Sequence, residues 1–364
     1  MKKLEKKLRV GILGGTGMVG QRFITLLDGH PWFQVTTIAA SSRSSGKTYK
    51  EAMTGRWKLE DKMPEAVKDI IVKDVKDIDE ISSSVDFVFS AVDMTKEEIK
   101  AIEDDYAKAE TPVVSNNSAH RWTEDVPMVV PEINIDHFDI IETQKKRLGT
   151  KRGFVAVKPN CSIQGYVPAL AAWQKFEPYK VCVTTYQAIS GAGKNFSDWP
   201  EMLGNIIPYI GGEEEKSEIE PLKILGSIKD GKFVKADNLI ITSQCVRVPV
   251  LEGHTAAVFV KFRKNPSKEE LIDRLKNFSG FPQENDLPSA PKPFINYLSE
   301  DDRPQVAKDV YYEKGFGVSV GRVRKDTLFD YKFIGLAHNT VRGAAGGAIL
   351  CAESLVEKGY ITHK

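Results

Sequence analysis

The chain has 364 residues, with 51 Lys and Arg against 50 Asp and Glu and 41% hydrophobic residues. This length is typical of about two domains and allows a large hydrophobic core, which excludes a small disulfide-stapled scaffold. The balanced charge argues against disorder and against a general nucleic-acid-binding protein. No apolar run approaches the roughly 20 residues that span a bilayer, so we expect no membrane insertion.

Cysteine usage and the first residues indicate the cellular setting. The four cysteines form no CxxC pair and no disulfide framework, which favours a reducing, cytoplasmic environment. They are Cys161, Cys182, Cys245 and Cys351, and the last three fall in apolar patterns typical of core residues. The charged start, residues 1–9, meets a glycine-rich turn before any apolar signal region develops, so we interpret it as a solvated arm.

The first motif is a strand, a glycine-rich turn and a helix. We expect a strand over Leu8–Leu13, a helix over Gln21–Leu27 and a second strand over Gln34–Ala40. The turn contains both G-x-G-x-x-G and G-x-x-G-x-x-G spacings. In this context they favour dinucleotide binding, because glycines allow close backbone approach and the helix start offers N–H groups to a pyrophosphate. An ordinary glycine turn is the alternative. The candidate cofactor-binding residues here are Gly14, Gly15, Thr16, Gly17, Met18 and Val19.

The residues after the second strand favour NADP over NAD. An NAD site usually has Asp or Glu at this point, to bond the ribose hydroxyls. Here Ala40 is followed by hydroxyl groups and cations, among them Ser41, Arg43, Ser44 and Lys47, which suit a 2′-phosphate. A flexible polar loop is the alternative interpretation.

Further alternating elements extend the same sheet. We expect a strand over 85–91, a helix over Thr95–Ala109 and strands over 111–115 and 153–157. This alternation predicts an α/β fold with a Rossmann-type, doubly wound parallel sheet. The pattern changes near residue 158, where we place a domain boundary.

One thiol and one imidazole are candidates for nucleophilic catalysis. Cys161 is expected at the start of a helix over Ser162–Trp173, where helix N–H groups would lower the thiol pKa and favour a thiolate. A buried structural cysteine is the alternative. His254, which follows a strand and turn, is the best candidate for its proton partner, although a lone histidine at such a position is more often structural. The histidine spacing suggests no metal site.

Together these residues resemble the aspartate-semialdehyde dehydrogenase family, in the branch shared by archaea and fungi, over nearly the whole chain. The segments that carry the resemblance are residues 14–20, Ser115-Asn116-Asn117-Ser118-Ala119-His120-Arg121, Pro159-Asn160-Cys161-Ser162, Gln187-Ala188-Ile189-Ser190-Gly191-Ala192-Gly193, Glu213-Glu214-Glu215-Lys216, Arg247-Val248-Pro249-Val250 and Gly253-His254.

The resemblance implies a reversible, phosphate-dependent reaction. NADPH would reduce L-4-aspartyl phosphate to L-aspartate 4-semialdehyde and phosphate, in the biosynthesis of lysine, threonine, methionine and isoleucine. Cys161 is implied as the nucleophile that forms a thioester, and His254 as the acid–base group. Gln187 would orient the substrate near Cys161.

The resemblance also implies three charged subsites. Arg247 would bind the α-carboxylate through its planar guanidinium, and Glu213 would face the amino group, although the three consecutive acids leave open which one does so. Lys216 would bind phosphate together with Arg121 and Asn160.

Further cofactor contacts are implied near the nicotinamide. They involve Ser190, Gly191 and Asn339, whose amide could bond the nicotinamide carboxamide. The small residues after Asn339 are equally typical of a packing helix, and both roles are compatible.

The resemblance implies two domains and a homodimer or homotetramer. Residues 1–158 plus 339–364 would form the NADP-binding domain, and residues 159–338 an α+β catalytic and dimerisation domain. The proline-rich segment 286–303 is expected to be a connecting loop. Malonyl-coenzyme A reductase, N-acyl-glutamyl-phosphate reductase, a hydrolytic aldehyde dehydrogenase and a noncatalytic NADP sensor are the alternatives.

Overall fold

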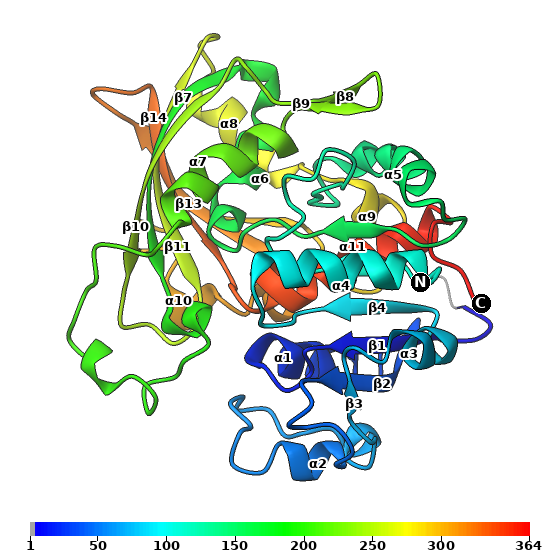
Figure 1. Cartoon of the computed structure of the whole chain (residues 1–364). Helices are drawn as coiled ribbons and strands as arrows, with labels where there is room; N and C mark the ends of the chain where they lie inside the picture. The colour runs from blue at the N-terminus through cyan, green and yellow to red at the C-terminus, as the bar shows by residue number, and fades with distance from the viewer. Residues whose placement is uncertain (1–3) are drawn as a thin grey trace.

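The computed structural model describes residues 4–364 (Figure 1). Its first sheet is parallel and six-stranded. The first three residues of the predicted arm lie outside the described residues. The strand order is β3-β2-β1-β4-β5-β6, which confirms the expected Rossmann-type sheet. The strands are β1 (Leu8–Leu13), β2 (Phe33–Ala40), β3 (Lys73–Asp74), β4 (Phe87–Ser90), β5 (Val113–Ser115) and β6 (Val155–Val157).

Helices cover both faces of this sheet. Because side chains alternate along a strand, Phe87 and Phe89 of β4 pack with Phe23 on one face, whereas Val88 packs with Ile99 on the other. The helices within this part of the chain are α1 (Met18–Leu27), α2 (Tyr49–Ala52), α3 (Ile78–Ser84), α4 (Lys96–Lys108) and α5 (Ile141–Leu148).

Helix α1 begins at Met18, three residues earlier than the predicted start at Gln21. Gly17 occupies the N-cap, so the turn takes fewer residues than the glycine spacing suggests. Gly20 therefore lies inside the helix, where an added Cβ would lie 2.3 Å from the Gly14 carbonyl oxygen. The third glycine of the motif thus serves close packing of the helix on the turn.

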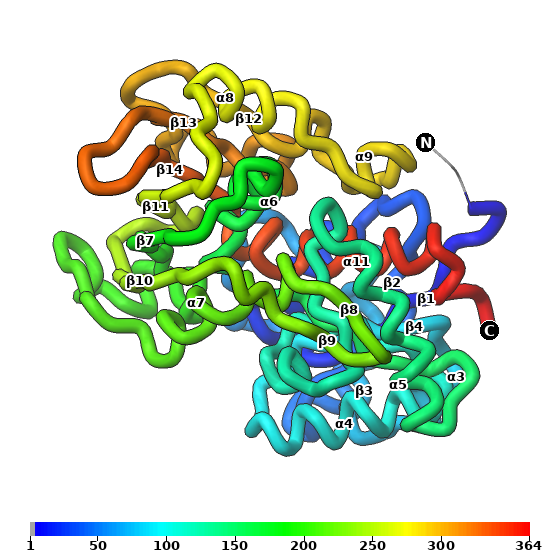
Figure 2. The backbone as a smooth tube through the Cα atoms, turned by 90° about the horizontal axis from the view of Figure 1, so that it is seen from above, coloured from blue at the N-terminus to red at the C-terminus, as the bar shows by residue number. Residues whose placement is uncertain are grey.

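The second sheet is mixed, with the order β10-β7-β11-β14-β13-β12 (Figure 2). Helices α6 and α8 cover one face. On the other face Tyr186 and Ile240 are 40% and 66% exposed. The elements are α6 (Val167–Ala172), β7 (Pro178–Gln187), α7 (Glu213–Ile224), the hairpin β8 (Ser227–Lys229) and β9 (Lys232–Val234), β10 (Ile240–Arg247), β11 (His254–Phe262), α8 (Lys268–Lys276), α9 (Phe281–Glu284), β12 (Ile295–Leu298), α10 (Val306–Asp309), β13 (Val318–Lys325) and β14 (Tyr331–Ala337).

Strand β12 corrects the prediction that 286–303 is only a connecting loop. Its residues pair in parallel with β13, from Ile295 opposite Val318 to Leu298 opposite Gly321. The prolines before and after it suit an edge strand, because only one side of such a strand needs ladder hydrogen bonds. The strand was not predicted because the many prolines in this segment are typical of a loop.

The predicted helix over Ser162–Trp173 is broken in two. A 3₁₀ turn, η3 (Ser162–Gly165), follows Cys161, and α6 starts only at Val167. Gly165 lies so close to Gly335 of β14 that no side chain fits between the two backbones. This close approach places the Cys161 turn directly on the second sheet.

The C-terminal segment returns to the first sheet (Figure 2). A π turn, η8 (Val341–Ala345), leads into α11 (Gly346–Glu357), which contacts α1 and β5. The predicted division into residues 1–158 plus 339–364 and residues 159–338 remains a prediction. Within residues 4–364, no helix is long and apolar enough to cross a membrane.

Replacing Gly335 by Ala should destabilise the fold and disturb the Cys161 turn. A Cβ at Gly335 would lie 1.7 Å from the Gly165 carbonyl oxygen, so the two backbones must separate. We expect the free energy of unfolding to fall by about 1–3 kcal/mol or more, measured by urea denaturation. Gly211→Ala is the control, because nothing lies closer than 3.8 Å to its Cβ position. Equal stability of the two variants would contradict this packing argument.

Candidate active site

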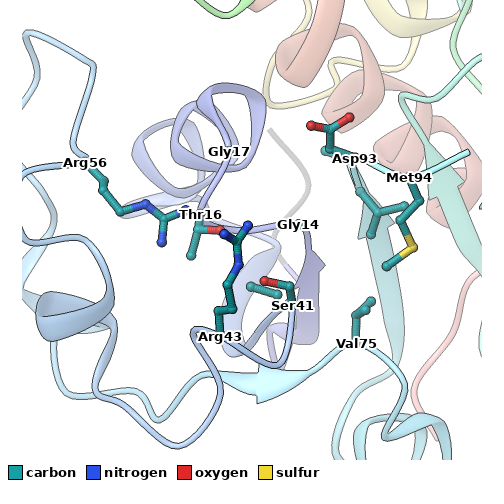
Figure 3. A pocket seen from close by; sticks show the side chains of 12 residues that line it. Gly14, Thr16, Gly17, Ser41, Arg43, Arg56, Val75, Asp93 and Met94 are labelled. Atoms are coloured by element: carbon teal, nitrogen blue, oxygen red, sulfur yellow. The ribbon is translucent and has the colours of Figure 1, made fainter.

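A pocket lies at the carboxyl ends of β1 and β4, against the glycine-rich turn (Figure 3). Gly14 has a φ of +83°, which side-chain-bearing residues rarely adopt. A Cβ there would also lie 2.3 Å from the Ala91 carbonyl oxygen. Without a side chain at Gly14, the turn packs closely on Ala91, and its backbone before α1 lines the pocket.

The pocket gathers part of the predicted cofactor-binding set. The predicted residues that line it are Gly14, Thr16, Gly17, Ser41 and Arg43. Gly15 instead faces the sheet, where its Cβ would lie 2.5 Å from Ile38, and its carbonyl accepts a hydrogen bond from Tyr49. Met18, Val19 and Ser44 do not line this pocket, and Val19 lines the neighbouring pocket that contains Cys161.

Arg56 is a second guanidinium in the same pocket (Figure 3). Its Nη1 donates to Ser44 Oγ at 3.3 Å, so the predicted hydroxyl group supports Arg56. Among the described residues, neither Arg43 nor Arg56 forms an ion pair with a carboxylate. Two exposed cations without acidic partners thus lie where the sequence predicted a phosphate subsite.

The structure brings Cys161 and His254 together although 93 positions separate them. Cys161 precedes η3, and His254 is the first residue of β11. The Cys161 Sγ lies 3.5 Å from His254 Nε2, and the Ala188 N–H donates to His254 Nδ1 at 3.0 Å. Because Nδ1 accepts this bond, a neutral His254 carries its proton on Nε2, facing the sulfur.

Burial keeps both groups neutral in the free protein. Desolvation, together with the nearby Arg247 charge, lowers the pKa of His254 to about 3. Desolvation, reinforced by the Glu213 carboxylate, raises the pKa of the Cys161 thiol to about 11. The prediction of a lowered thiol pKa is therefore wrong: one 3₁₀ turn supplies less helix dipole than a full helix, and burial dominates.

Glu213, the first residue of α7, connects several predicted residues. Its Oε1 accepts hydrogen bonds from Asn160 Nδ2 at 3.0 Å and Lys216 Nζ at 2.9 Å, and its Oε2 accepts one from Gln187 Nε2 at 3.2 Å. Burial opposes ionisation, but the Lys216 ammonium and these hydrogen bonds hold the pKa of Glu213 below its ordinary value. Of the three consecutive acids, Glu213 lines the Cys161 pocket.

The two predicted arginines differ in their partners. Arg121 is buried and donates from Nη1 to Glu220 Oε1 at 2.8 Å. Arg247 donates from Nη1 to the Ala188 carbonyl at 2.7 Å and forms no ion pair with any described residue. Arg247 therefore retains an uncompensated charge beside His254, available to an anionic ligand.

Asn339 holds the C-terminal segment against the site. Its Oδ1 accepts from the Gly253 N–H at 2.7 Å and its Nδ2 donates to Ser190 Oγ at 2.8 Å. Asn339, Ser190 and Gly191 all line the Cys161 pocket. Within the described residues, no group of three or more His, Cys, Asp or Glu side chains is arranged to hold a metal.

Comparison with known proteins identifies the family. Residues 9–141 match the model for the NAD-binding domain of semialdehyde dehydrogenases, and residues 169–342 match that for their dimerisation domain. An aspartate-semialdehyde dehydrogenase from Aspergillus fumigatus is 43% identical, over 98% of this chain and 99% of its own length. The chain belongs to the aspartate-semialdehyde dehydrogenase family. The predicted resemblance is thereby confirmed.

Relatives from an archaeon and a second fungus agree with this assignment. An aspartate-semialdehyde dehydrogenase from Methanothermobacter thermautotrophicus is 41% identical, over 96% of this chain and 99% of its own. The crystal structure of the Candida albicans aspartate semialdehyde dehydrogenase with NADP superposes with a TM-score of 0.87 at 39% identity, covering 98% of this chain and 100% of that one. The aspartate-semialdehyde dehydrogenase fold thus extends over both sheets.

Sequence reasoning missed two charged residues near these pockets, Arg56 and Glu220. Arg56 follows a short helix and belongs to no motif, and Glu220 lies two helical turns beyond Glu213. The buried Glu220 carboxylate accepts from the Asn160 N–H at 2.6 Å as well as from Arg121. The seven-residue spacing from Glu213 to Glu220 places both acids on one helix face, so this spacing could have predicted that Glu220 lies near the site.

Alkylation of Cys161 should report a neutral thiol in the free enzyme. Because its pKa is raised to about 11, the rate with iodoacetamide should climb about tenfold per pH unit from pH 7 to 10, following the thiolate fraction. His254, with its pKa lowered to about 3, should add no inflection between pH 5 and 8. Mass spectrometry of the Cys161 peptide distinguishes its alkylation from that of Cys182, which is partly exposed as well. A rate plateau below pH 7 would instead indicate a thiolate–imidazolium pair.

Proposed function

We propose that the chain catalyses the reversible, NADPH-dependent conversion of L-4-aspartyl phosphate to L-aspartate 4-semialdehyde and phosphate. The observation that carries this proposal is the 3.5 Å approach of Cys161 Sγ to His254 Nε2 at a pocket that Arg121 and Lys216 also line. A thiol, an imidazole and two cations suit the transfer of an acyl group between sulfur and phosphate. Curated relatives with full-length similarity bear the name of this enzyme.

The glycine-turn pocket fits a dinucleotide. Side chains at Gly14 and Gly20 would collide with backbone, so the cradle is specific to glycine. The N–H groups at the start of α1 suit a pyrophosphate, and Arg43 and Arg56 suit a 2′-phosphate. We place NADP in this pocket, and the Candida albicans relative, whose structure is with NADP, supports the choice of cofactor. The bound cofactor would supply a hydride.

In the proposed reaction, Cys161 attacks the acyl carbon. The S–C bond forms as the C–O bond to phosphate breaks, and the thiol proton leaves with the phosphate. After hydride addition, the His254 Nε2–H donates to the oxygen that has become negative. When this oxygen becomes the aldehyde carbonyl, the Cys161 thiolate is released and takes a proton from solvent.

The charged side chains divide the recognition of the substrate. Arg247, which has no acidic partner, would bind the α-carboxylate, and Glu213 would face the amino group. Lys216 and Arg121 would bind the phosphate together with Asn160. Gln187 would orient the substrate indirectly, because its amide contacts Glu213 and Thr185.

The proposed assembly uses the open face of the second sheet. The family model over 169–342 is a dimerisation domain, and this face exposes Tyr186 and Ile240. A homodimer, or a homotetramer built from it, would cover these apolar groups. We also propose the two-domain division, with residues 1–158 plus 339–364 holding the cofactor. All four cysteines are unpaired, which supports a cytoplasmic location.

Replacing Cys161 by Ala should abolish turnover of aspartate semialdehyde with NADP and phosphate, followed as nicotinamide absorbance at 340 nm. Binding of NADP, followed by fluorescence titration, should change by less than about twofold, because the thiol contacts only the substrate. Cys182→Ala, in the second sheet, is the matched control and should retain turnover. Wild-type turnover without phosphate would favour a hydrolytic aldehyde dehydrogenase, and turnover of malonyl-coenzyme A in place of the semialdehyde would favour that reductase.

Replacing Arg43 by Ala should weaken NADP more than NAD, because only NADP offers a 2′-phosphate. Since solvent screens this exposed group, we expect an affinity loss of about 3- to 10-fold for NADP and almost none for NAD. Lys50→Ala, a nearby exposed cation outside the pocket, is the control. Equal losses for both cofactors would show that Arg43 supports the loop without contacting the phosphate.

A further inference from the structure

A buried ion pair next to the Cys161 turn joins two residues that are far apart in the sequence. Arg342 of η8 and Glu132 are 210 positions apart, and their side chains are 1% and 0% exposed. Nη1 and Nη2 of Arg342 each donate to one carboxylate oxygen of Glu132 at 2.7 Å. The Phe294 ring centroid lies 4.6 Å from the guanidinium carbon, so the plane of the guanidinium is fixed as well.

Stability alone does not account for this pair. Desolvating two charges offsets much of their attraction, and well-packed apolar residues often serve equally well. A guanidinium differs from an apolar residue because, when both Nη atoms are bound to a carboxylate, its Nε–H remains as a third, directional donor. The partner of this Nε–H therefore indicates the role of the ion pair.

The third donor of Arg342 contacts the Cys161 turn. Its Nε donates to Gln164 Oε1 at 3.1 Å. Because a guanidinium can only donate, Gln164 must present its oxygen, which turns its Nε2 toward the Asn160 carbonyl at 3.4 Å. The Gln164 N–H also donates to the Cys161 carbonyl at 3.3 Å. Gln164 thus holds the backbone on both sides of the sulfur-bearing residue.

The residue after Arg342 packs on the same turn. An added Cβ at Gly343 would lie 2.7 Å from the Cys161 Cβ, so the two backbones are in contact. The Gly343 N–H donates to the His338 carbonyl at 2.8 Å, which keeps η8 in place. Arg342 and Gly343 therefore confine the Cys161 turn, one through Gln164 and the other by direct packing.

We propose that Arg342 is a positioning residue for the nucleophile. Anchored by Glu132, it sets the amide orientation of Gln164, and Gln164 fixes the Cys161 turn so that Sγ stays beside His254 Nε2. Arg342 touches neither sulfur nor imidazole. This inference rests on the proposed function, because it assigns the residue that orients the reacting thiol.

Two variants test the contact from its two sides. Arg342→Lys retains a cation for Glu132 but loses the directional Nε donor, and Gln164→Leu leaves the ion pair intact. Each should lower kcat about 10- to 100-fold, because small displacements of a reacting group are costly. The KM for the semialdehyde and the Kd for NADP should change by less than about twofold. If Arg342→Lys does not fold, Gln164→Leu decides alone.

The matched control is Arg147→Lys, which alters a forked Arg147–Asp125 pair at α5. It should leave kcat unchanged. The double variant Arg342→Lys/Gln164→Leu should be no slower than the slower single variant, because both changes remove one contact. A kcat within about twofold of wild type, an equal loss in Arg147→Lys, or multiplied losses in the double variant would overturn the proposal.

Alkylation of Cys161, measured without substrate, separates this inference from the proposed function. Absence of wild-type turnover would reject the function alone. The iodoacetamide rate at pH 8 should still differ from wild type by more than about twofold in Arg342→Lys and Gln164→Leu, and not in Arg147→Lys, because the reactivity of a thiol follows its surroundings. An unchanged rate in both would overturn the positioning role.

Discussion

The site depends on backbone segments that approach too closely to admit a side chain. Gly165 of the Cys161 turn lies against Gly335 of β14, and Gly343 lies against Cys161 itself. Strand β14 also pairs with β11, where Ala337 lies opposite His254. One strand therefore fixes both the nucleophile turn and the imidazole. Because protein interiors are close-packed, the distance between Sγ and Nε2 follows from the register of this sheet.

The electrostatics of the pocket follow from the same burial. Arg121 is compensated by Glu220, and Lys216 by Glu213. Desolvation, with the Arg121 charge, lowers the pKa of the buried Lys158 ammonium to about 7. Among the described residues, neither Lys158 nor Arg247 forms an ion pair, and Arg247 is the guanidinium without an acidic partner. An anionic ligand therefore finds one uncompensated guanidinium beside the thiol, which favours binding of a carboxylate in a single orientation.

Local patterns in the sequence predicted the elements but not the long-range contacts. The α4 boundaries were correct to one residue, because Thr95 and Glu98 form a capping box that is visible in the sequence. The pairing of Cys161 with His254 was a candidate from the residues, with a structural histidine as the alternative, and the family resemblance strengthened it. Arg342 and Glu132 carry no local pattern, so their contact could not be predicted. The predicted direction of the thiol pKa shift was wrong because burial is a property of the tertiary structure, and a helix start alone does not reveal it.

The neutral state of His254 constrains the path of the proton in the proposed reaction. Its Nδ1 is occupied by the Ala188 N–H, so accepting a proton would require an imidazolium, which burial opposes. Nε2–H is instead a fixed donor, suited to a sulfur or oxygen that becomes negative during the reaction. The thiol proton then needs another acceptor, and in the acyl-phosphate direction the departing phosphate is basic enough to take it. The proposed phosphate subsite of Arg121 and Lys216 would therefore also hold the group that removes the proton from Cys161.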